Sequence, residues 1–415
     1  MREELVVIGN GMAAGRALER LIEAAPDRYR ITVFNAEPRV NYDRIMLSLL
    51  LSGEKQFDDI VIHDDAWYAR HRITLYKGSR VTAIDRANRT VTGGGITVRY
   101  DKLIVATGSS PLIIPIPGKD LPGVVTFRDY DDVSAMRSVA RRGGRAIVIG
   151  GGLLGLEAAA GLRLQGMDVT VVHLMPTLME RQLDPVAGQL LADTLRGRGI
   201  EVLTGANSRQ ILGGDKVAGL ELTDGRVLAA DLIVMAVGIR PNAALAREAG
   251  LHVNRGIVTD AGLQTSDPDI FALGECVEIV GQCFGLVAPL YDMANVVAAR
   301  LAGDKMACFH PVATATRLKV TGINLYSAGD FASGEGRQDI VLRDDAAGIY
   351  KRIVLRDDTV IGVVLYGETG DGPWYFDLVK TQVEARGIRN LLAFGRAFET
   401  AMPLEPYGGR CSVAG

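Results

Sequence analysis

Two glycine-rich turns, each placed directly after a short apolar run, constrain this chain more than any other feature of its sequence. Residues 9–15 (GNGMAAG) follow the run LVVI at 5–8, and residues 150–155 (GGGLLG) follow the run AIVI at 146–149. Each pattern predicts a strand, a tight turn and a helix, in which the glycines let the backbone approach a pyrophosphate and the helix N-terminus favours its charge. One such turn is weak evidence, but two in one chain predict two bound dinucleotides with hydride transfer between them.

The segments around the two turns repeat each other as well, which predicts the α/β class with a duplicated Rossmann-like fold. An apolar run follows each predicted helix, at 31–34 and at 169–172, and completes a βαβ unit. Further along, the run at 102–106 ends in Thr107 and Gly108, and its near copy at 231–236 ends in Val237 and Gly238.

Composition changes mark the expected domains. Prolines at 111, 115, 117 and 122 predict an extended linker between the two halves. We expect a discontinuous first dinucleotide domain at 1–113 and 241–310, a second one at 114–240, and a C-terminal α+β domain at 311–415. In the last domain we expect short strands at 340–342 and 359–365, a helix near 375–386 and a frayed tail from Met402.

Composition also excludes several functional classes. A chain of 415 residues predicts two or three domains, and its net charge of -3 gives no electrostatic reason to bind nucleic acid or an anionic membrane. No apolar stretch is long enough to span a bilayer, and a strand begins too early for a signal peptide. The four cysteines, Cys276, Cys283, Cys308 and Cys411, form no CxxC pair, so we expect no metal site and a reduced, cytoplasmic protein with buried thiols.

A family resemblance follows from these motifs and several shorter ones. They are the first turn, Glu37 with Pro38, and the stretches 42–48 (YDRIMLS), 100–109, 150–157, 178–184 (LMERQLD), 236–241, 265–276, 285–289 and 317–320. Together they resemble the N-terminal flavin module of assimilatory NADH nitrite reductase large subunits, within the wider family of rubredoxin, ferredoxin and glutathione-reductase-like flavoproteins. The resemblance implies that the first domain binds FAD and the second binds NAD(P)H.

The resemblance assigns roles at the FAD site. Glu37 is expected to bond a ribose hydroxyl, and Arg44 to offset charge near the FAD pyrophosphate or flavin; the plain alternatives are a solvated carboxylate and a surface arginine. Glu275 stands where the superfamily usually has an Asp holding the ribityl chain. Ala288 and Pro289 would open a helix facing the flavin pyrimidine ring. The FAD set is Gly9, Gly11, Met12, Ala13, Glu37, Arg44, Ser48, Val81, Ala106, Thr107, Gly108, Gly274, Glu275, Ala288 and Pro289.

The implied nicotinamide nucleotide site has one unusual position. Relatives that prefer NADH carry an acid after the second strand, but here His173 is followed by Leu174 and Met175, and no adjacent Arg offers a 2′-phosphate site. A neutral His can bond a hydroxyl and a protonated one a phosphate, so we expect NADH with NADPH open. Glu157 is either near the nicotinamide or an ordinary helix residue. The NAD(P)H set is Gly150, Gly152, Leu153, Leu154, Gly155, Glu157, His173, Val237 and Gly238.

The sequence lacks the cysteines that several related flavoproteins use in catalysis, which excludes their reaction types. The CxxxxC pair of disulfide reductases is missing, and residues 41–52 hold no cysteine of the peroxidase or oxidase type. Leu49 stands where ferredoxin and rubredoxin reductases often have a Lys, which favours the nitrite reductase branch. We therefore predict an FAD-dependent NAD(P)H oxidoreductase without side-chain acid or base catalysis. It passes hydride from NADH to FAD, then electrons to an iron–sulfur, rubredoxin-type or sirohaem partner in nitrite or nitrate assimilation.

Other interpretations stay open at this point. A rubredoxin or ferredoxin reductase of another pathway uses the same chemistry, and a small-molecule reductase or a non-catalytic NADH-sensing flavoprotein are further alternatives. Full nitrite reductase large subunits continue into cluster and sirohaem segments, so this chain is either a module of a longer protein or works with a partner chain. Trp374, Tyr375 and Phe376 could face their own core or a second subunit, which leaves a homodimer open.

Overall fold

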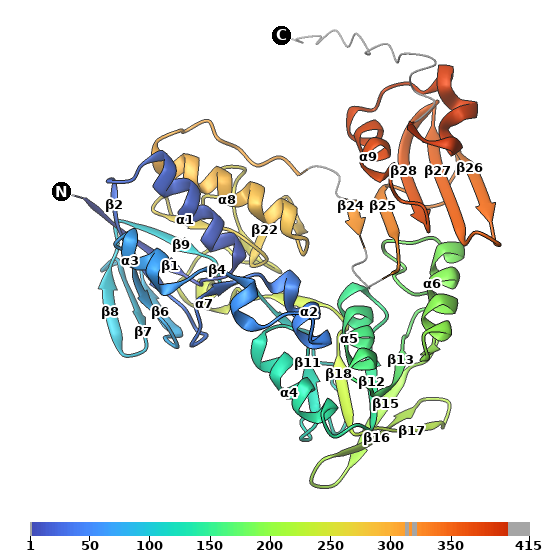
Figure 1. The fold of residues 1–415 in the computed structure, drawn as a ribbon. Coiled ribbons are helices and arrows are strands. Elements are labelled where there is room, and N and C mark those ends of the chain that lie inside the picture. The colour runs from blue at the N-terminus through green and yellow to red at the C-terminus, as the bar shows by residue number, and fades with distance from the viewer. Residues whose placement is uncertain (1, 312–314, 318–321, 397–415) are drawn as a thin grey trace. The chain divides into compact units, whose positions relative to one another are not determined.

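The computed structural model describes residues 2–311, 315–317 and 322–396, and the chain packs as two compact units. The first unit comprises Met1–Ile113, Thr126–Arg137 and Val237–Pro311, and the second comprises Ile114–Val125, Ser138–Ala236 and Val312–Gly415. Figure 1 shows the elements of both. The division into three domains at 113, 240 and 310 stays a prediction. Cys411, the tail from Met402, and residues 318–320 of the third-domain motif lie outside the described residues.

The first unit is built on a parallel sheet that follows directly from the apolar runs. Its strand order is β21–β9–β1–β2–β5, and neighbouring strands are parallel throughout. Central parallel strands are covered on both faces and are rich in apolar residues, and in β1 the side chains of Leu5, Val6 and Val7 are fully buried. The strands are β1 (Glu3–Ile8), β2 (Tyr29–Phe34), β5 (Thr74–Tyr76), β9 (Lys102–Val105) and β21 (Ile270–Ala272).

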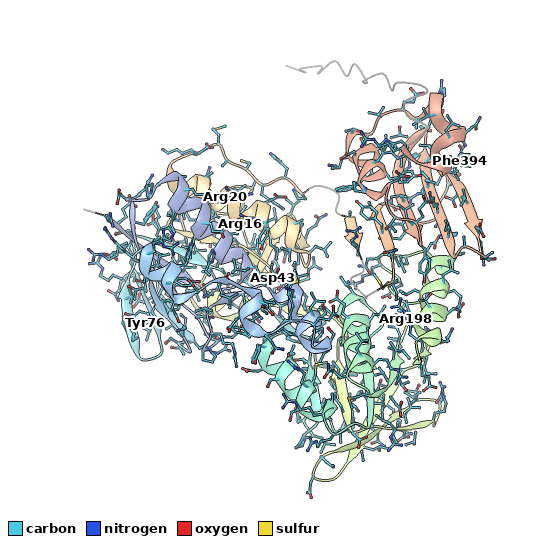
Figure 2. The ribbon with its side chains drawn as sticks, viewed as in Figure 1. Arg16, Arg20, Asp43, Tyr76, Arg198 and Phe394 are labelled. Carbon is cyan, nitrogen blue, oxygen red and sulfur yellow. The ribbon has the colours of Figure 1, made fainter. Side chains whose placement is uncertain are left out.

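Two long helices, α1 (Met12–Ala24) and α8 (Val287–Ala302), lie side by side in this unit (Figure 1). Arg16, seen with Arg20 along α1 in Figure 2, places its guanidinium 4.8 Å from the ring centroid of Tyr291 near the start of α8. Just beyond the other end of α1, the Tyr29 hydroxyl donates to Leu301 O at 2.9 Å, near the end of α8. The two contacts show that the helices run parallel, so both N-termini lie at the same end.

Short elements complete the first unit, including the antiparallel sheet β6–β7–β8 and the pair β10–β19. Two elements, β11 (Val124–Thr126) and α4 (Tyr130–Ala140), cross the division between the units. The others are β3 (Asn41–Tyr42), η1 (Arg44–Met46), α2 (Leu47–Ser52), η2 (Phe57–Ile60), β4 (Val61–His63), α3 (Asp65–Arg70), β6 (Val81–Asp85), β7 (Thr90–Gly93), β8 (Ile96–Arg99), β10 (Ser109–Pro111), β19 (Ile239–Pro241), α7 (Ala244–Glu248), β20 (Ile257–Val258), β22 (Val277–Ile279) and β23 (Gln282–Cys283).

The second unit contains a sheet of the same design, which confirms the predicted duplication. Its order is β11–β18–β12–β13–β14, and it is accompanied by an antiparallel sheet β15–β16–β17 that corresponds to β6–β7–β8. The elements are β12 (Arg145–Ile149), α5 (Leu153–Leu164), β13 (Asp168–Val172), α6 (Pro185–Gly197), β14 (Ile200–Leu203), β15 (Ser208–Gly213), β16 (Val217–Leu222), β17 (Val227–Ala229) and β18 (Leu232–Met235).

The C-terminal part of the second unit is α+β, as predicted for the fold class. An antiparallel sheet β24–β25–β28–β27–β26 packs its buried face on α9, and Tyr375 is fully buried in this core. The helix expected near 375–386 is present as α9, but it begins and ends earlier, because Gln382 takes a left-handed conformation that ends it, and a separate η3 follows. The elements are β24 (Ala315–Arg317), β25 (Leu325–Gly329), β26 (Arg337–Asp344), β27 (Ile349–Arg356), β28 (Thr359–Tyr366), α9 (Gly372–Thr381) and η3 (Arg386–Phe394).

The cysteines differ from the expectation of buried thiols. Cys276 is fully buried, and burial raises the pKa of its thiol, so it behaves as a small apolar side chain. Cys283 and Cys308 are exposed, and for them the expectation is wrong. Cys283 lies in the two-residue edge strand β23, where the sheet covers it poorly. In the part of the chain that the structure describes, no helix combines the length and the apolar character needed to cross a membrane.

Candidate functional site

The first glycine turn contains glycines of two kinds. Gly9 has φ of +108°, and a Cβ there would lie 2.1 Å from Ala106 O, so the fold itself requires glycine. At Gly11 the φ is -80°, which any residue adopts, and an added Cβ would meet no described atom within 4 Å. Neither packing nor backbone conformation explains why residue 11 is a glycine. Close approach of a ligand to the backbone does explain it.

The second turn repeats this division. Gly150 has φ of +120°, and a Cβ on Gly155 would lie 2.0 Å from Gly150 O, so both positions are fixed by the fold. Gly152 has φ of -84° and open space around its Cβ position. Gly11 and Gly152 are therefore equivalent positions, and at both of them the protein leaves space that a ligand could fill.

The helix N-termini behind the two turns are uncapped by side chains. Gly11 and Gly152 are the N-cap residues of α1 and α5, and no described side chain bonds to the first-turn N–H groups of either helix. In contrast, Asp184 caps α6 by accepting from Ala187 N at 2.9 Å. The open N–H groups of α1 and α5 can hold the pyrophosphate of a dinucleotide.

The parallel sheet of the first unit gathers most of the predicted FAD residues at one edge. The carboxyl ends of parallel strands share an edge, and Gly9, Glu37, Ala106 and Gly274 follow β1, β2, β9 and β21. Two contacts draw these segments together: Ala106 O lies against Gly9, and a Cβ added at Gly274 would lie 3.6 Å from Ala13 Cβ. Met12 opens the helix that starts from this edge.

Glu37 and Arg44 are joined in one ionic group. The Tyr42 hydroxyl donates to Glu37 Oε2 at 2.8 Å, and Arg44 Nη2 forms an ion pair with Glu37 Oε1. Arg44 Nη1 also donates to Arg128 O at 3.1 Å. Burial acts to lower the pKa of Arg44, but Tyr42 and Glu37 outweigh it and hold the pKa above its ordinary value. The Arg44 guanidinium therefore stays charged. The Glu37 carboxylate is already bonded to Tyr42 and Arg44.

Glu275 is held by two donors at a single carboxylate oxygen. Ser109 Oγ donates to Glu275 Oε2 at 2.8 Å, and Arg128 Nη2 forms an ion pair with the same oxygen. Among the described residues, Glu275 Oε1 accepts no hydrogen bond. Arg128 was not predicted from the sequence, because a single arginine between a strand and a helix matches no motif.

The remaining predicted FAD residues lie nearby in the chain's first unit. Thr107 exchanges two bonds with Asn242: its Oγ1 donates to Asn242 O at 2.7 Å, and its carbonyl accepts from Asn242 Nδ2 at 3.0 Å. Gly108 follows with φ of +65°. Ser48 lies on α2 and donates from Oγ to Ile45 O at 3.4 Å. Asn242 is a second residue that sequence reasoning missed.

Three further FAD candidates can be placed through neighbouring elements. Val81 begins β6, and a Cβ on Gly93 would touch both Val81 Cα (3.0 Å) and Phe34 Cδ1 (3.1 Å), so Val81 lies beside the end of β2. Ala288 and Pro289 stand in the first turn of α8. Since α8 runs parallel to α1, this turn lies at the same end as the glycine turn.

The predicted NAD(P)H residues surround the second turn, with His173 in an unexpected role. His173 is 8% exposed; its Nδ1 accepts from Gly151 N at 3.0 Å, and its Nε2 lies 3.1 Å from Glu180 Oε2. Because Nδ1 accepts a backbone N–H, the ring proton sits on Nε2 and is donated to Glu180. Both ring nitrogens are thus engaged by the chain itself.

The other NAD(P)H candidates are distributed along α5 and after β18. Leu153 and Leu154 open α5, and Leu154 is exposed, whereas Glu157 on the same helix is buried. Val237 and Gly238 directly follow Ala236 in the chain and belong to the first unit. The assignment of individual residues in both nucleotide sets stays a prediction.

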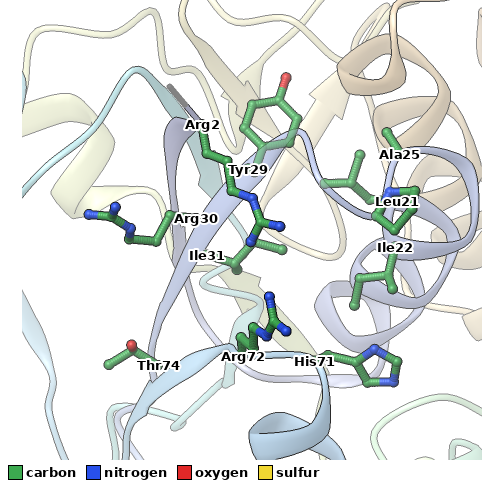
Figure 3. Close-up of a pocket in the computed structure, with 11 residues that line it drawn as sticks. Arg2, Leu21, Ile22, Ala25, Tyr29, Arg30, Ile31, His71, Arg72 and Thr74 are labelled. Atoms are coloured by element: carbon green, nitrogen blue, oxygen red, sulfur yellow. The ribbon is translucent and has the colours of Figure 1, made fainter.

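A separate pocket of about 250 Å³ lies at the opposite edge of the first unit's sheet (Figure 3). Arg2, Arg30 and Arg72 line it, close to the starts of β1, β2 and β5. Arg2 is ion-paired with Asp27, and Arg30 with Glu4. None of the predicted nucleotide residues lines this pocket, so it belongs to neither glycine turn.

Two uncapped glycine turns on two matching parallel sheets define the class of oxidoreductases that bring two dinucleotides together. The chain belongs to the pyridine nucleotide-disulphide oxidoreductase family, whose model matches residues 3–302. Residues 315–383 match the rubredoxin NAD+ reductase C-terminal domain. Family membership implies binding of FAD and NAD(P)H, and the chain is an oxidoreductase that uses them.

Relatives and a solved structure support this identification. The chain is 45% identical over 92% of its length to a nitrite reductase [NAD(P)H] of Bacillus subtilis (strain 168), of which it covers 48%. It is 43% identical over 89% of its length to the assimilatory nitrate reductase electron transfer subunit of the same organism, again covering 48%. The chain therefore spans about half the length of these curated relatives. A structure of the covalent putidaredoxin reductase–putidaredoxin complex is 26% identical and matches with a TM-score of 0.83, over 92% of this chain and 94% of that one.

Proposed function

We propose that this chain is a flavoprotein reductase that takes hydride from NADH and hands electrons to a separate redox protein in nitrite or nitrate assimilation. The observation that carries the proposal is the matched pair Gly11 and Gly152, where glycine is needed neither for packing nor for backbone conformation. Each opens an uncapped helix, and two such cradles in one chain suit two pyrophosphates.

The residues of the first unit fit FAD. The α1 N-terminus at Gly11 would hold the pyrophosphate, with the charged Arg44 as a nearby cation. Glu275 Oε1 would accept from a ribityl hydroxyl. Asn10 Nδ2, in the same turn, is buried without a partner among the described residues, so the turn holds a donor to spare. When bound, FAD accepts a hydride and can release the two electrons one at a time.

The second unit would hold NADH at Gly152 and the start of α5, and NAD+ would leave after the hydride has passed. Among the described residues, Cys276, Cys283 and Cys308 are free thiols that form no disulfide. We therefore propose that the electrons leave to an external acceptor.

An iron–sulfur, rubredoxin-type or sirohaem protein is the acceptor we propose. Support comes from the match to the rubredoxin NAD+ reductase C-terminal domain, and from a relative that is an electron transfer subunit of nitrate reductase. The neighbouring structure is a reductase joined to its putidaredoxin. The role in assimilation is taken from the name of the nitrate reductase relative, and both this role and a cytoplasmic location are part of the proposal for this chain.

An anaerobic titration tests the proposal. The purified chain, reconstituted with FAD, is titrated with NADH and separately with NADPH while the visible flavin absorbance is followed. We expect stoichiometric bleaching by NADH, and a Gly152→Leu variant that keeps its FAD but is no longer bleached. A wild-type protein that stays yellow with both nucleotides contradicts the proposal and favours a nucleotide-sensing flavoprotein instead.

The acceptor is tested with the same reduced protein. Mixing it with an oxidised 2Fe–2S ferredoxin, a rubredoxin or a sirohaem protein should reoxidise the flavin, and each two-electron-reduced FAD should reduce two equivalents of a one-electron acceptor. Fast reoxidation by a quinone, with no transfer to any of these proteins, would instead identify a small-molecule reductase.

A further inference from the structure

Two hydrogen bonds join the loop after β13 to the second glycine turn, one near each end of the loop. Gly151 N–H donates to His173 Nδ1 at 3.0 Å, and Met179 N–H donates to Gly151 O at 3.0 Å. Met179 has φ of +50°, which is unusual for a residue with a Cβ, so the loop is held in a specific conformation at this point. One residue of the turn, Gly151, thus binds both the beginning and the end of residues 173–179.

Glu180, the next residue, is positioned by the same anchor. Its Oε2 lies 3.1 Å from His173 Nε2, and its side chain remains 33% exposed. His173 is the residue directly after β13, about 20 residues beyond the turn, where a Rossmann-like site reads the 2′ position of the adenosine ribose. The sequence has no acid at position 173 itself. The loop instead brings the carboxylate of Glu180 next to this position.

We propose that Glu180 is the acid that makes this site prefer NADH over NADPH, and that His173 is its positioning residue. The inference rests on the proposed function and names the nucleotide of the same site. Glu180 can accept a hydrogen bond from the 2′-hydroxyl of NADH, whereas its charge repels the 2′-phosphate of NADPH. His173 keeps the carboxylate in place while its other nitrogen holds the turn.

Arg181 offers the opposing chemistry. It is exposed and makes no ion pair or hydrogen bond within the described residues, so its guanidinium is available to a 2′-phosphate. Glu180, however, is bonded to a buried ring that is itself bonded to the turn, whereas Arg181 has no such support. The anchored charge sets the preference, and Arg181 accounts for residual NADPH binding.

Equilibrium binding of NAD+ and NADP+ to the oxidised, FAD-loaded protein tests the proposal by calorimetry, without turnover. Wild type should bind NAD+ more tightly. Glu180→Gln should tighten NADP+ binding roughly tenfold, while NAD+ binding changes much less. His173→Phe keeps an aromatic ring at this position but removes both hydrogen bonds, and it should shift the NAD+/NADP+ ratio in the same direction. Glu201→Gln, on β14 of the same unit, is the matched control and should leave the ratio unchanged.

The outcomes separate the two proposals. If wild type binds neither nucleotide, the proposed function fails. If both bind and Glu180→Gln leaves their ratio unchanged, only the role of Glu180 is overturned, and it is equally overturned if Arg181→Ala alone controls the ratio. A His173→Phe variant that weakens both nucleotides equally would make His173 a structural residue and remove its positioning role.

Discussion

Arg128 and Glu275 form an ion pair in the first unit that uses only one oxygen of the carboxylate. Ser109 donates to that same oxygen, Oε2, at 2.8 Å, so two donors fix the orientation of the side chain. The other oxygen, Oε1, has no bond within the described residues. Because the carboxylate is already oriented, binding a ligand hydroxyl at Oε1 costs little further ordering.

Glu275→Gln is therefore expected to weaken FAD binding. The amide keeps the size of the side chain but loses the charge that holds Arg128, and a hydrogen bond to a charged group contributes about 1.5–3 kcal/mol. The dissociation constant of FAD should rise by roughly 10- to 100-fold, measured by fluorescence of the released flavin. Glu23→Gln, at an exposed ion pair on α1, serves as the control. Equal FAD affinity in both variants would remove Glu275 from the site.

Substitutions at Gly9 and Gly11 should have different consequences although the residues are two positions apart. Gly11→Leu adds a side chain where the protein leaves open space, so the chain should fold with an unchanged melting temperature but fail to retain FAD. Gly9→Ala places a Cβ 2.1 Å from Ala106 O at a positive φ, so it should lower the melting temperature itself. The measurements are flavin content after purification and thermal unfolding of the apoprotein. FAD-replete Gly11→Leu protein would argue against a ligand at this turn.

The architecture could be predicted because local rules and global fold agree along this chain. Apolar strands such as residues 5–8 and 146–149 end at glycines, and the helices that follow begin at Gly11 and Gly152, as the sequence pattern requires. The C-terminal helix was predicted less well, since its end depends on the left-handed conformation of Gln382, a residue that does not signal a stop.

Contacts between distant segments were not predictable from the same rules. Arg128 meets Glu275 across 147 positions, and Asn242 meets Thr107 across 135. Glu275 and Thr107 belong to predicted motifs, but Arg128 and Asn242 do not. His173 was identified as the unusual position, but its bonds to Gly151 and Glu180 depend on how the loop folds back. Residue type indicated where a site lies, and only the structure showed which neighbours are already engaged.

Tyr350→Phe should destabilise the second unit. The Tyr350 hydroxyl on β27 donates to Asp184 Oδ2 at 2.5 Å, and Arg352 Nη1 lies 3.3 Å from the same oxygen. Asp184 is 5% exposed, so removing one of its partners leaves a buried charge less well compensated, at a cost of about 1.5–3 kcal/mol. Chemical denaturation followed by tryptophan fluorescence measures the loss. Tyr326→Phe is the control, because the Tyr326 hydroxyl bonds to no described group; a similar loss there would contradict the role of the Asp184 bond.

His63 should make the first unit less stable in mild acid. Burial lowers the pKa of His63 and outweighs Glu19, whose Oε1 lies 2.8 Å from Nε2, and Nδ1 is buried without a partner among the described residues. Because the folded-state pKa lies below the unfolded value of about 6.5, the unfolded chain takes up more protons, so stability is lost as the pH falls from about 6.5 through the folded-state pKa. Melting temperatures at about pH 8 and about pH 5.5 measure this loss. The loss should be smaller in His63→Gln and unchanged in His252→Gln, whose residue is exposed. If wild type and His63→Gln lose the same amount, the acid sensitivity of the unit arises elsewhere.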